Sequence, residues 1–111
     1  MKARFSDLIS SQVPVLVDFS AAWCGPCKMM SPVLQQVKER LGDRIKILKV
    51  DVDKNPDLAA EYRIQSVPSL ILFRNGRVEW SGAGVTTAKH LEDIISRFSH
   101  AAANGILMSL P

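Results

Sequence analysis

The apolar residues form short continuous runs that alternate with longer stretches of helical periodicity. Val13–Ser20 (VPVLVDFS) is rich in β-branched residues and almost continuously apolar, which is typical of a strand buried on both faces of a sheet. The next stretch, Pro26–Leu41, predicts a helix, with Gly42 as its C-cap. Its apolar residues recur every three or four positions, at Met29, Met30, Val33, Leu34, Val37 and Leu41.

The following segment predicts a second strand and a short helix. Ile45–Asp53 (IKILKVDVD) again favours a strand, and Asn55 and Pro56 are typical of the first positions of a helix, here through Tyr62. Residues 1–12 leave room for a short helix at Phe5–Ile9. Because strand, helix and strand follow one another, this half predicts a βαβ unit with a right-handed crossover.

The last part of the chain predicts a hairpin and a helix. Asn75-Gly76 is a strong turn signal, and it separates the strands Ser69–Arg74 and Arg77–Ser81. Thr87 is the expected cap of the final helix. One face of that helix carries Leu91, Ile94, Ile95 and Phe98. The elements together predict an α/β domain with a mixed sheet flanked by helices on both faces.

One domain accounts for residues 1–99, and residues 100–111 are expected to extend the last helix or to fray. The run Ala101–Ala103 favours helix, whereas Asn104-Gly105 is expected to end it. At 111 residues and 47% apolar content, the chain has the size and composition of a single globular domain. Four strands are expected, with a fifth N-terminal strand short or absent.

The charge pattern argues against several classes of partner. The formal net charge is +3, and the basic residues are scattered rather than gathered in a stripe, which disfavours nucleic-acid binding. No run approaches the roughly 18 apolar residues that cross a bilayer, and no signal peptide is recognised. We therefore expect a cytoplasmic protein, in a compartment that keeps thiols reduced, and a monomer without nucleic-acid or membrane partners.

Both cysteines lie in the segment Cys24-Gly25-Pro26-Cys27, between the first strand and its helix. A zinc half-site is one interpretation, but only His90 and His100 are available as further ligands, and we expect no metal. A pair of inert core residues is a second interpretation. The third is a redox dithiol, because cysteines three residues apart in the first helical turn can form a disulfide with little backbone movement.

The position at a helix N-terminus favours the redox interpretation. Unpaired backbone N–H groups and the helix dipole stabilise negative charge there, so they favour the thiolate of Cys24. Gly25 leaves space for a partner chain, and Pro26 suits the first helical turn because its missing N–H has no intrahelical acceptor.

The sequence resembles the thioredoxin family over roughly residues 5–98. The segment Trp23–Lys28 (WCGPCK) matches the family's active-site motif, and further matches follow in family order and spacing. These are the VDF of Val17–Phe19, the Asp-Val-Asp at the end of the second strand, Val67-Pro68-Ser69, the FRNG of Phe73–Gly76, and Gly84. The resemblance implies a thioredoxin-like fold and a thiol–disulfide oxidoreductase that reduces protein disulfides.

The resemblance also implies roles for the residues around the motif. Cys24 is expected to attack a substrate disulfide, and Cys27, lying deeper, is expected to resolve the mixed disulfide. Asp18 would be a buried general base for Cys27, although a strand-end carboxylate facing solvent is an alternative. Lys49 matches the family's lysine near that carboxylate, where it would oppose a rise in the carboxylate's pKa; a solvated strand lysine is equally compatible with the sequence.

Four further residues are expected to form the substrate-docking surface. The family places a cis peptide bond at Pro68, beside the cysteines, with the backbone of Val67 presented to an extended substrate. Trp23 and Gly84 would complete the apolar floor, although Trp23 also fits a core position. Ser20 departs from the family, which usually carries an aromatic residue there.

The resemblance implies that the chain binds no cofactor. Its oxidised form would be returned to the dithiol by thioredoxin reductase, with NADPH as the ultimate electron source. Two other functions remain open at this point: an oxidising or isomerising relative, and a non-catalytic binding module that uses the same groove. The Gly-Pro pair between the cysteines is the dipeptide of reducing family members.

Overall fold

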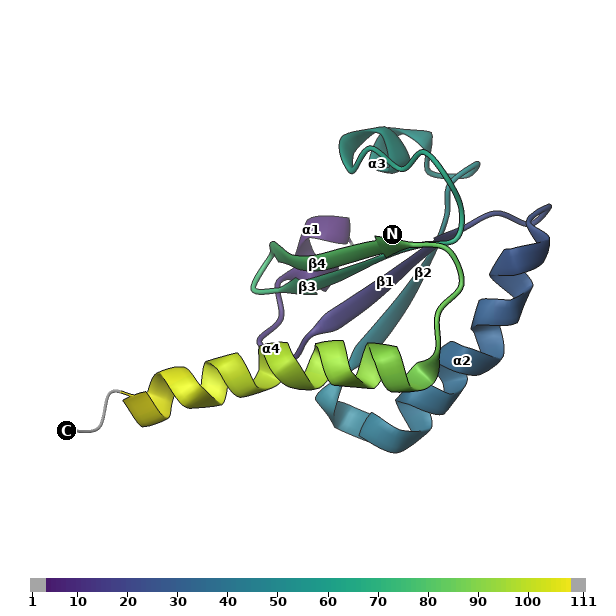
Figure 1. Cartoon of the computed structure of the whole chain (residues 1–111). Helices are drawn as coiled ribbons and strands as arrows, with labels where there is room; N and C mark the ends of the chain where they lie inside the picture. Colours follow the sequence, from purple (N-terminus) through teal and green to yellow (C-terminus); the bar gives the residue numbers. More distant parts are fainter. Residues whose placement is uncertain (1–3, 109–111) are drawn as a thin grey trace.

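The computed structural model describes residues 4–108, with side chains through Ser99, and its centre is a four-stranded sheet (Figure 1). The strands are β1 (Val15–Ser20), β2 (Lys46–Asp51), β3 (Ser69–Arg74) and β4 (Arg77–Ala83). Their order across the sheet is β2-β1-β3-β4. β2 runs parallel to β1, whereas β1–β3 and β3–β4 are antiparallel, which confirms the predicted mixed sheet.

Helices cover both faces of the sheet, as the alternation of elements predicted. In Figure 1, α2 (Gly25–Leu41) and α4 (Ala88–Met108) lie on one face, and α1 (Phe5–Ile9) and α3 (Pro56–Glu61) lie on the other. A short 3-10 turn, η1 (Gly42–Arg44), joins α2 to β2. Among residues 4–108, no helix has the length and apolar character needed to cross a membrane.

The larger core cluster lies between the sheet and the α2–α4 layer. The sheet contributes the fully buried Leu16, Leu70 and Leu72. The helices contribute Met30, Leu34, Val37, Leu91, Ile94 and Ile95. Burying a side chain of this size contributes about 1.5–3 kcal/mol to stability. This cluster therefore holds α2, and with it the N-terminus of that helix, in place against the sheet.

The opposite face is built around aromatic residues. Phe19 and Phe73 are fully buried there, and Phe5 and Tyr62 pack against them from outside the sheet. The rings of Tyr62 and Phe73 meet edge to face with centroids 5.3 Å apart, a favoured aromatic geometry. Aromatic packing therefore holds α1 and α3 against this face, and α1 is also joined to the β3–β4 turn because Gly76 donates its N–H to the Ile9 carbonyl at 3.1 Å.

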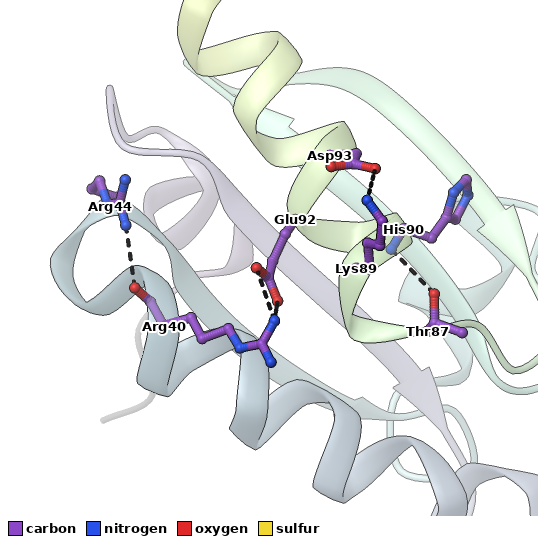
Figure 2. Close-up of polar contacts among 7 residues, drawn as sticks. All are labelled: Arg40, Arg44, Thr87, Lys89, His90, Glu92 and Asp93. Carbon is purple, nitrogen blue, oxygen red and sulfur yellow. Dashed lines mark hydrogen bonds and ion pairs between the residues drawn. The ribbon is translucent and has the colours of Figure 1, made fainter.

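Local contacts fix the ends of the long helices. Gly42 has a φ of 55° and donates its N–H to the Lys38 carbonyl, so the predicted C-cap of α2 is confirmed. Figure 2 shows the Thr87 hydroxyl accepting the His90 N–H at 3.1 Å, which confirms the cap of α4. The same view shows Arg40 of α2 paired with Glu92 of α4 at 3.2 Å. This ion pair lies at the surface and therefore contributes little beyond packing.

The end of α4 departs from the sequence prediction. The helix continues through Asn104-Gly105 to Met108, so the expectation that this dipeptide ends the helix is wrong. An interior glycine costs only about 1 kcal/mol relative to alanine, and each further residue of an existing helix adds a hydrogen bond. In Figure 1 this last part of α4 extends beyond the sheet.

Three strands also differ from the prediction in their bounds. β4 ends at Ala83 rather than Ser81. β1 begins at Val15 rather than Val13, because Pro14 lacks an N–H for the ladder. β2 covers Lys46–Asp51 rather than Ile45–Asp53. The Asp51 carboxylate accepts hydrogen bonds from the backbone N–H groups of Asp53 and Lys54 at 2.8 and 3.2 Å, and these bonds turn the chain away from the sheet.

Candidate active site

The two cysteines meet where β1 leads into α2. Cys24 is the N-cap of the 17-residue helix, and the backbone N–H of Cys27 donates to its sulfur at 3.1 Å. The two side chains form a disulfide, with Cα atoms 5.3 Å apart. A sulfur atom therefore occupies the acceptor position at the helix N-terminus, where negative charge is favoured.

The disulfide is buried, although the surface near Gly25 is open. Cys24 is 3% exposed and Cys27 is 6% exposed, so the prediction that Cys27 lies deeper is wrong by whole-residue exposure. The cysteines differ instead in their surroundings, because Cys24 faces the Val67 carbonyl whereas Cys27 lines the cavity next to Asp18. A Cβ placed on Gly25 would meet no atom within 4 Å, which leaves room for an approaching chain.

The segment at Val67 and Pro68 lies against the first cysteine. The Val67–Pro68 bond is cis, as predicted, and the Val67 carbonyl oxygen lies 3.6 Å from the Cys24 sulfur. Gly84 reaches the same segment, because its N–H donates to the Pro68 carbonyl at 2.8 Å. Its φ of +88° is a conformation that favours glycine. The structure thus brings Val67, Pro68 and Gly84 together next to Cys24.

Trp23 is a surface residue. It is 71% exposed, which excludes the alternative of a core tryptophan. Its indole Nε1–H donates to an Asp53 carboxylate oxygen at 2.9 Å, an interaction that orients the ring. An exposed indole immediately before the disulfide is apolar area available to a partner.

Asp18 is buried in the centre of the sheet. It is 1% exposed, which excludes the alternative of a carboxylate facing solvent, and neither carboxylate oxygen has a hydrogen-bond partner among the described residues. Burial raises the pKa of Asp18, and the positive charge of Lys49 opposes part of that rise. A cavity of about 210 Å³ joins Asp18 to Cys27, with room for water between them.

Lys49 lies beside Asp18 but does not form an ion pair with it. The two residues are register partners on β2 and β1, which places their side chains on the same face. The Lys49 ammonium group donates to the Ser31 hydroxyl of α2 at 2.9 Å. Lys49 and Ser31 both line the cavity that contains Asp18 and Cys27. Lys49 therefore acts on the Asp18 carboxyl through space.

The buried carboxylate predicts a pH-dependent stability difference. Because the folded-state pKa of Asp18 is raised, the wild type loses stability as pH rises from the unfolded value near 3.8 through the folded one. We expect Asp18→Asn to increase the free energy of unfolding by about 1–3 kcal/mol above that window, with a smaller difference at pH 4. Urea unfolding of both proteins from pH 4 to 8 measures this, and a difference that does not vary with pH would contradict it.

Two residues of the site were not found by sequence reasoning. Asp53 holds the Trp23 indole, and Ser31 holds the Lys49 ammonium group. Each contact joins positions 18 or more residues apart, so no local pattern reveals the pairing. The position of Asp53 in the sequence could have indicated the contact with Trp23. Asp53 follows a strand parallel to β1, and side chains that follow the carboxyl ends of neighbouring parallel strands lie close together.

A disulfide-forming pair at a helix N-terminus, next to a cis-proline and a buried carboxylate, defines a thiol–disulfide oxidoreductase. Comparison with known proteins gives the family. The thioredoxin family profile matches residues 1–97. Thioredoxin from Rickettsia typhi is 39% identical over 92 residues, which cover 83% of this chain and 88% of that protein.

Two further relatives extend the comparison. A Mycobacterium leprae protein named bifunctional thioredoxin reductase/thioredoxin is 48% identical over 73 residues, covering 66% of this chain and 16% of that protein. A mutant thioredoxin from Halobacterium salinarum with a solved structure is 34% identical, with a TM-score of 0.80; the match covers 89% of this chain and 86% of that one. The chain belongs to the thioredoxin family.

Proposed function

We propose that this thiol–disulfide oxidoreductase acts as a reductant of disulfide bonds in other proteins. The observation that carries the proposal is the Cys24–Cys27 pair at the N-terminus of α2, beside the Val67 carbonyl. A thiolate formed at this position attacks a disulfide, and the second sulfur is already within bonding reach. The Gly25-Pro26 pair supports a reducing role through the family resemblance, because Gly-Pro is the dipeptide between the cysteines of the family's reducing members.

The reaction proceeds through two exchanges. The Cys24 thiolate attacks one sulfur of the substrate disulfide, forming a mixed disulfide and releasing the other substrate sulfur as a thiolate that takes up a proton. The Cys27 thiolate then attacks the Cys24 sulfur and releases the second substrate thiolate. Two electrons thereby pass to the substrate, and the protein is left with the Cys24–Cys27 disulfide.

In the second exchange, Asp18 accepts the proton from Cys27. The shared cavity and the raised pKa of Asp18 support this role, because a base that titrates closer to neutral pH transfers protons more effectively. The transfer passes through water in the cavity. Lys49, held by Ser31, favours the ionised carboxylate and so limits the rise in the pKa of Asp18.

Protein substrates dock as extended chains across the surface next to Cys24. Val67 presents its backbone to the substrate, while Pro68 and Gly84 shape the adjoining segment. The exposed Trp23 indole supplies apolar contact area. This surface selects an unfolded or extended segment around a disulfide rather than a small molecule.

We further propose that a thioredoxin reductase returns the oxidised protein to its dithiol, drawing electrons from NADPH. The Mycobacterium leprae relative, whose name joins a thioredoxin reductase to a thioredoxin, supports this partnership. The chain works as a monomer that binds no cofactor itself, in the cytoplasm, where thiols are kept reduced.

The proposed base makes a kinetic prediction. Asp18→Asn is expected to slow release of the reduced substrate by about 10–100-fold at neutral pH, with a smaller effect on formation of the mixed disulfide. Stopped-flow mixing of reduced protein with a fluorophore-labelled disulfide peptide separates the two steps. Equal slowing of both steps would remove Asp18 from the proton transfer.

Two measurements test the proposed function. The protein should accelerate insulin reduction by dithiothreitol, followed as turbidity from the precipitating B chain. Equilibration with glutathione then separates a reductant from an oxidising relative. The Cys24–Cys27 disulfide of a reductant persists in a glutathione buffer, whereas the disulfide of an oxidant is reduced. No acceleration, or ready reduction by glutathione, would refute the proposal.

A further inference from the structure

A cavity of about 200 Å³ lies between the end of β4 and the first turn of α4. Residues 84–86, in the connection between these two elements, line one side of it (Figure 1). Leu70 of β3, Trp80 of β4 and His90 of α4 are also in its lining. No aspartate, glutamate, lysine or arginine is among the described residues that line it. The cavity therefore suits an uncharged group rather than an ion.

Two aromatic rings belong to the lining of this cavity. The half-buried Trp80 packs against the larger core cluster, and its indole lies over Gly82, because a Cβ on that glycine would come within 2.7 Å of two indole carbons. The His90 ring meets the indole edge to face, with centroids 6.3 Å apart and an angle of 73° between the planes. The core thus holds the indole in a fixed position beside the cavity.

The cavity is continuous with the surface next to the reactive cysteine. Gly84 belongs to both, because it lines the cavity and donates its N–H to the Pro68 carbonyl at 2.8 Å. The preceding residue, Val67, places its carbonyl oxygen 3.6 Å from the Cys24 sulfur. Val85 also lines the cavity and is 46% exposed. A chain that extends from the sulfur across this segment therefore passes next to the cavity.

The size and lining of the cavity indicate which side chain would occupy it. An apolar cavity of about 150 Å³ holds a benzene ring, so the larger cavity next to Gly84 has room for the ring of one aromatic residue. A further ring can meet the Trp80 indole in the offset or edge-to-face arrangements that aromatic pairs favour. A charged side chain would lose its hydration there without a carboxylate, lysine or arginine to pair with it.

We propose that this cavity is a specificity site, which takes an aromatic side chain of the protein substrate from a position near the reacting disulfide. The inference rests on the proposed function, since the occupant is part of a disulfide substrate. The cavity contains neither cysteine, so it contributes to substrate binding and leaves the two exchange steps unchanged. The protein therefore reduces disulfides flanked by an aromatic residue faster than equally accessible disulfides without one.

The substrate test compares capped peptides whose single cysteine forms a disulfide with glutathione. Phenylalanine, alanine or glutamate is placed at successive positions on either side of the cysteine, because the distance along the chain decides which position reaches the cavity. At the matching position, phenylalanine should raise the second-order rate constant for reduction about tenfold over alanine, and glutamate should give no gain. Equal rates for phenylalanine and alanine at every position, or faster reduction with glutamate, would overturn this inference alone, whereas no reduction of any peptide would refute the proposed function as well.

Val85→Asp and Val78→Asp are a matched pair of variants. Both valines are exposed, at 46% and 52%, but Val78 lies earlier on β4 and is not part of the cavity lining. The preference for phenylalanine over alanine should fall below about twofold in Val85→Asp and stay near tenfold in Val78→Asp. Because each preference compares two peptides on one variant, a general change in activity cancels. Equal preferences in the two variants would overturn the inference.

NMR spectra identify the occupied site without any redox step. The best phenylalanine peptide, with serine in place of its cysteine, is titrated into the oxidised, full-length protein. The Trp80 indole N–H and the Val85 methyl signals should shift, and the corresponding alanine peptide should leave them unchanged. Shifts confined to the Trp23 indole would overturn the inference, because the exposed ring beside Cys24, rather than the cavity, would then bind the aromatic side chain.

Discussion

Cys24→Ser is expected to lower insulin reduction to the rate of dithiothreitol alone. The hydroxyl of serine does not ionise near neutral pH, so no nucleophile remains at the N-terminus of α2. Cys27 cannot substitute for it, because its sulfur faces the cavity with Asp18 rather than the Val67 segment. The turbidity assay, with equal concentrations of wild type and variant, measures the loss.

Met29→Ser is the matched control for this substitution. Met29 lies on the same helix and is 61% exposed, so a serine there should leave the reduction rate within about twofold of wild type. Substantial activity in Cys24→Ser, with Met29→Ser also active, would show that the attacking sulfur had been assigned wrongly.

Cys27→Ser is expected to trap the protein on its substrate. Cys24 retains its position at the helix N-terminus and attacks, but no second sulfur is present to release the mixed disulfide. We therefore expect about one covalent adduct per protein and loss of turnover after the first exchange. Mass spectrometry of the variant after reaction with a disulfide peptide measures the stoichiometry and the cysteine that carries the peptide.

This experiment tests the assignment of the two cysteines directly. Their burial does not distinguish them, since both are less than one-tenth exposed. An adduct on Cys27 in Cys24→Ser, together with an unmodified Cys24 in Cys27→Ser, would reverse the proposed roles. The assignment depends on which sulfur faces the docking segment, and the contact between Cys24 and Val67 indicates Cys24.

Much of the fold could be predicted because its signals are local. The bounds of β3 follow from an apolar run that ends in a strong turn dipeptide, and the cap at Gly42 follows from the end of a periodic stretch. The end of α4 could not be predicted in this way. Asn104-Gly105 favours a helix end, but the cost is small enough for a helix of this length to continue.

The candidate site likewise contains some residues that the sequence identifies and some contacts that only the structure shows. Cys24 and Cys27 lie within one short motif, and Asp18 is marked by its position in an otherwise apolar strand. The cis bond at Pro68 was predicted only from the family resemblance. The contacts of Trp23 and Lys49 with residues of distant segments depend on the packing of β2 against its neighbours, which no single stretch of sequence encodes.

The measurement that tests the account most directly is the pH dependence of alkylation of the reduced protein by iodoacetamide, with the modified cysteine identified by mass spectrometry. The account predicts that Cys24 reacts first, with a midpoint clearly below the value of about 8.5 of a free thiol. If neither sulfur reacts at lower pH than glutathione does under the same conditions, no thiolate is stabilised at the N-terminus of α2, and the proposed chemistry is contradicted.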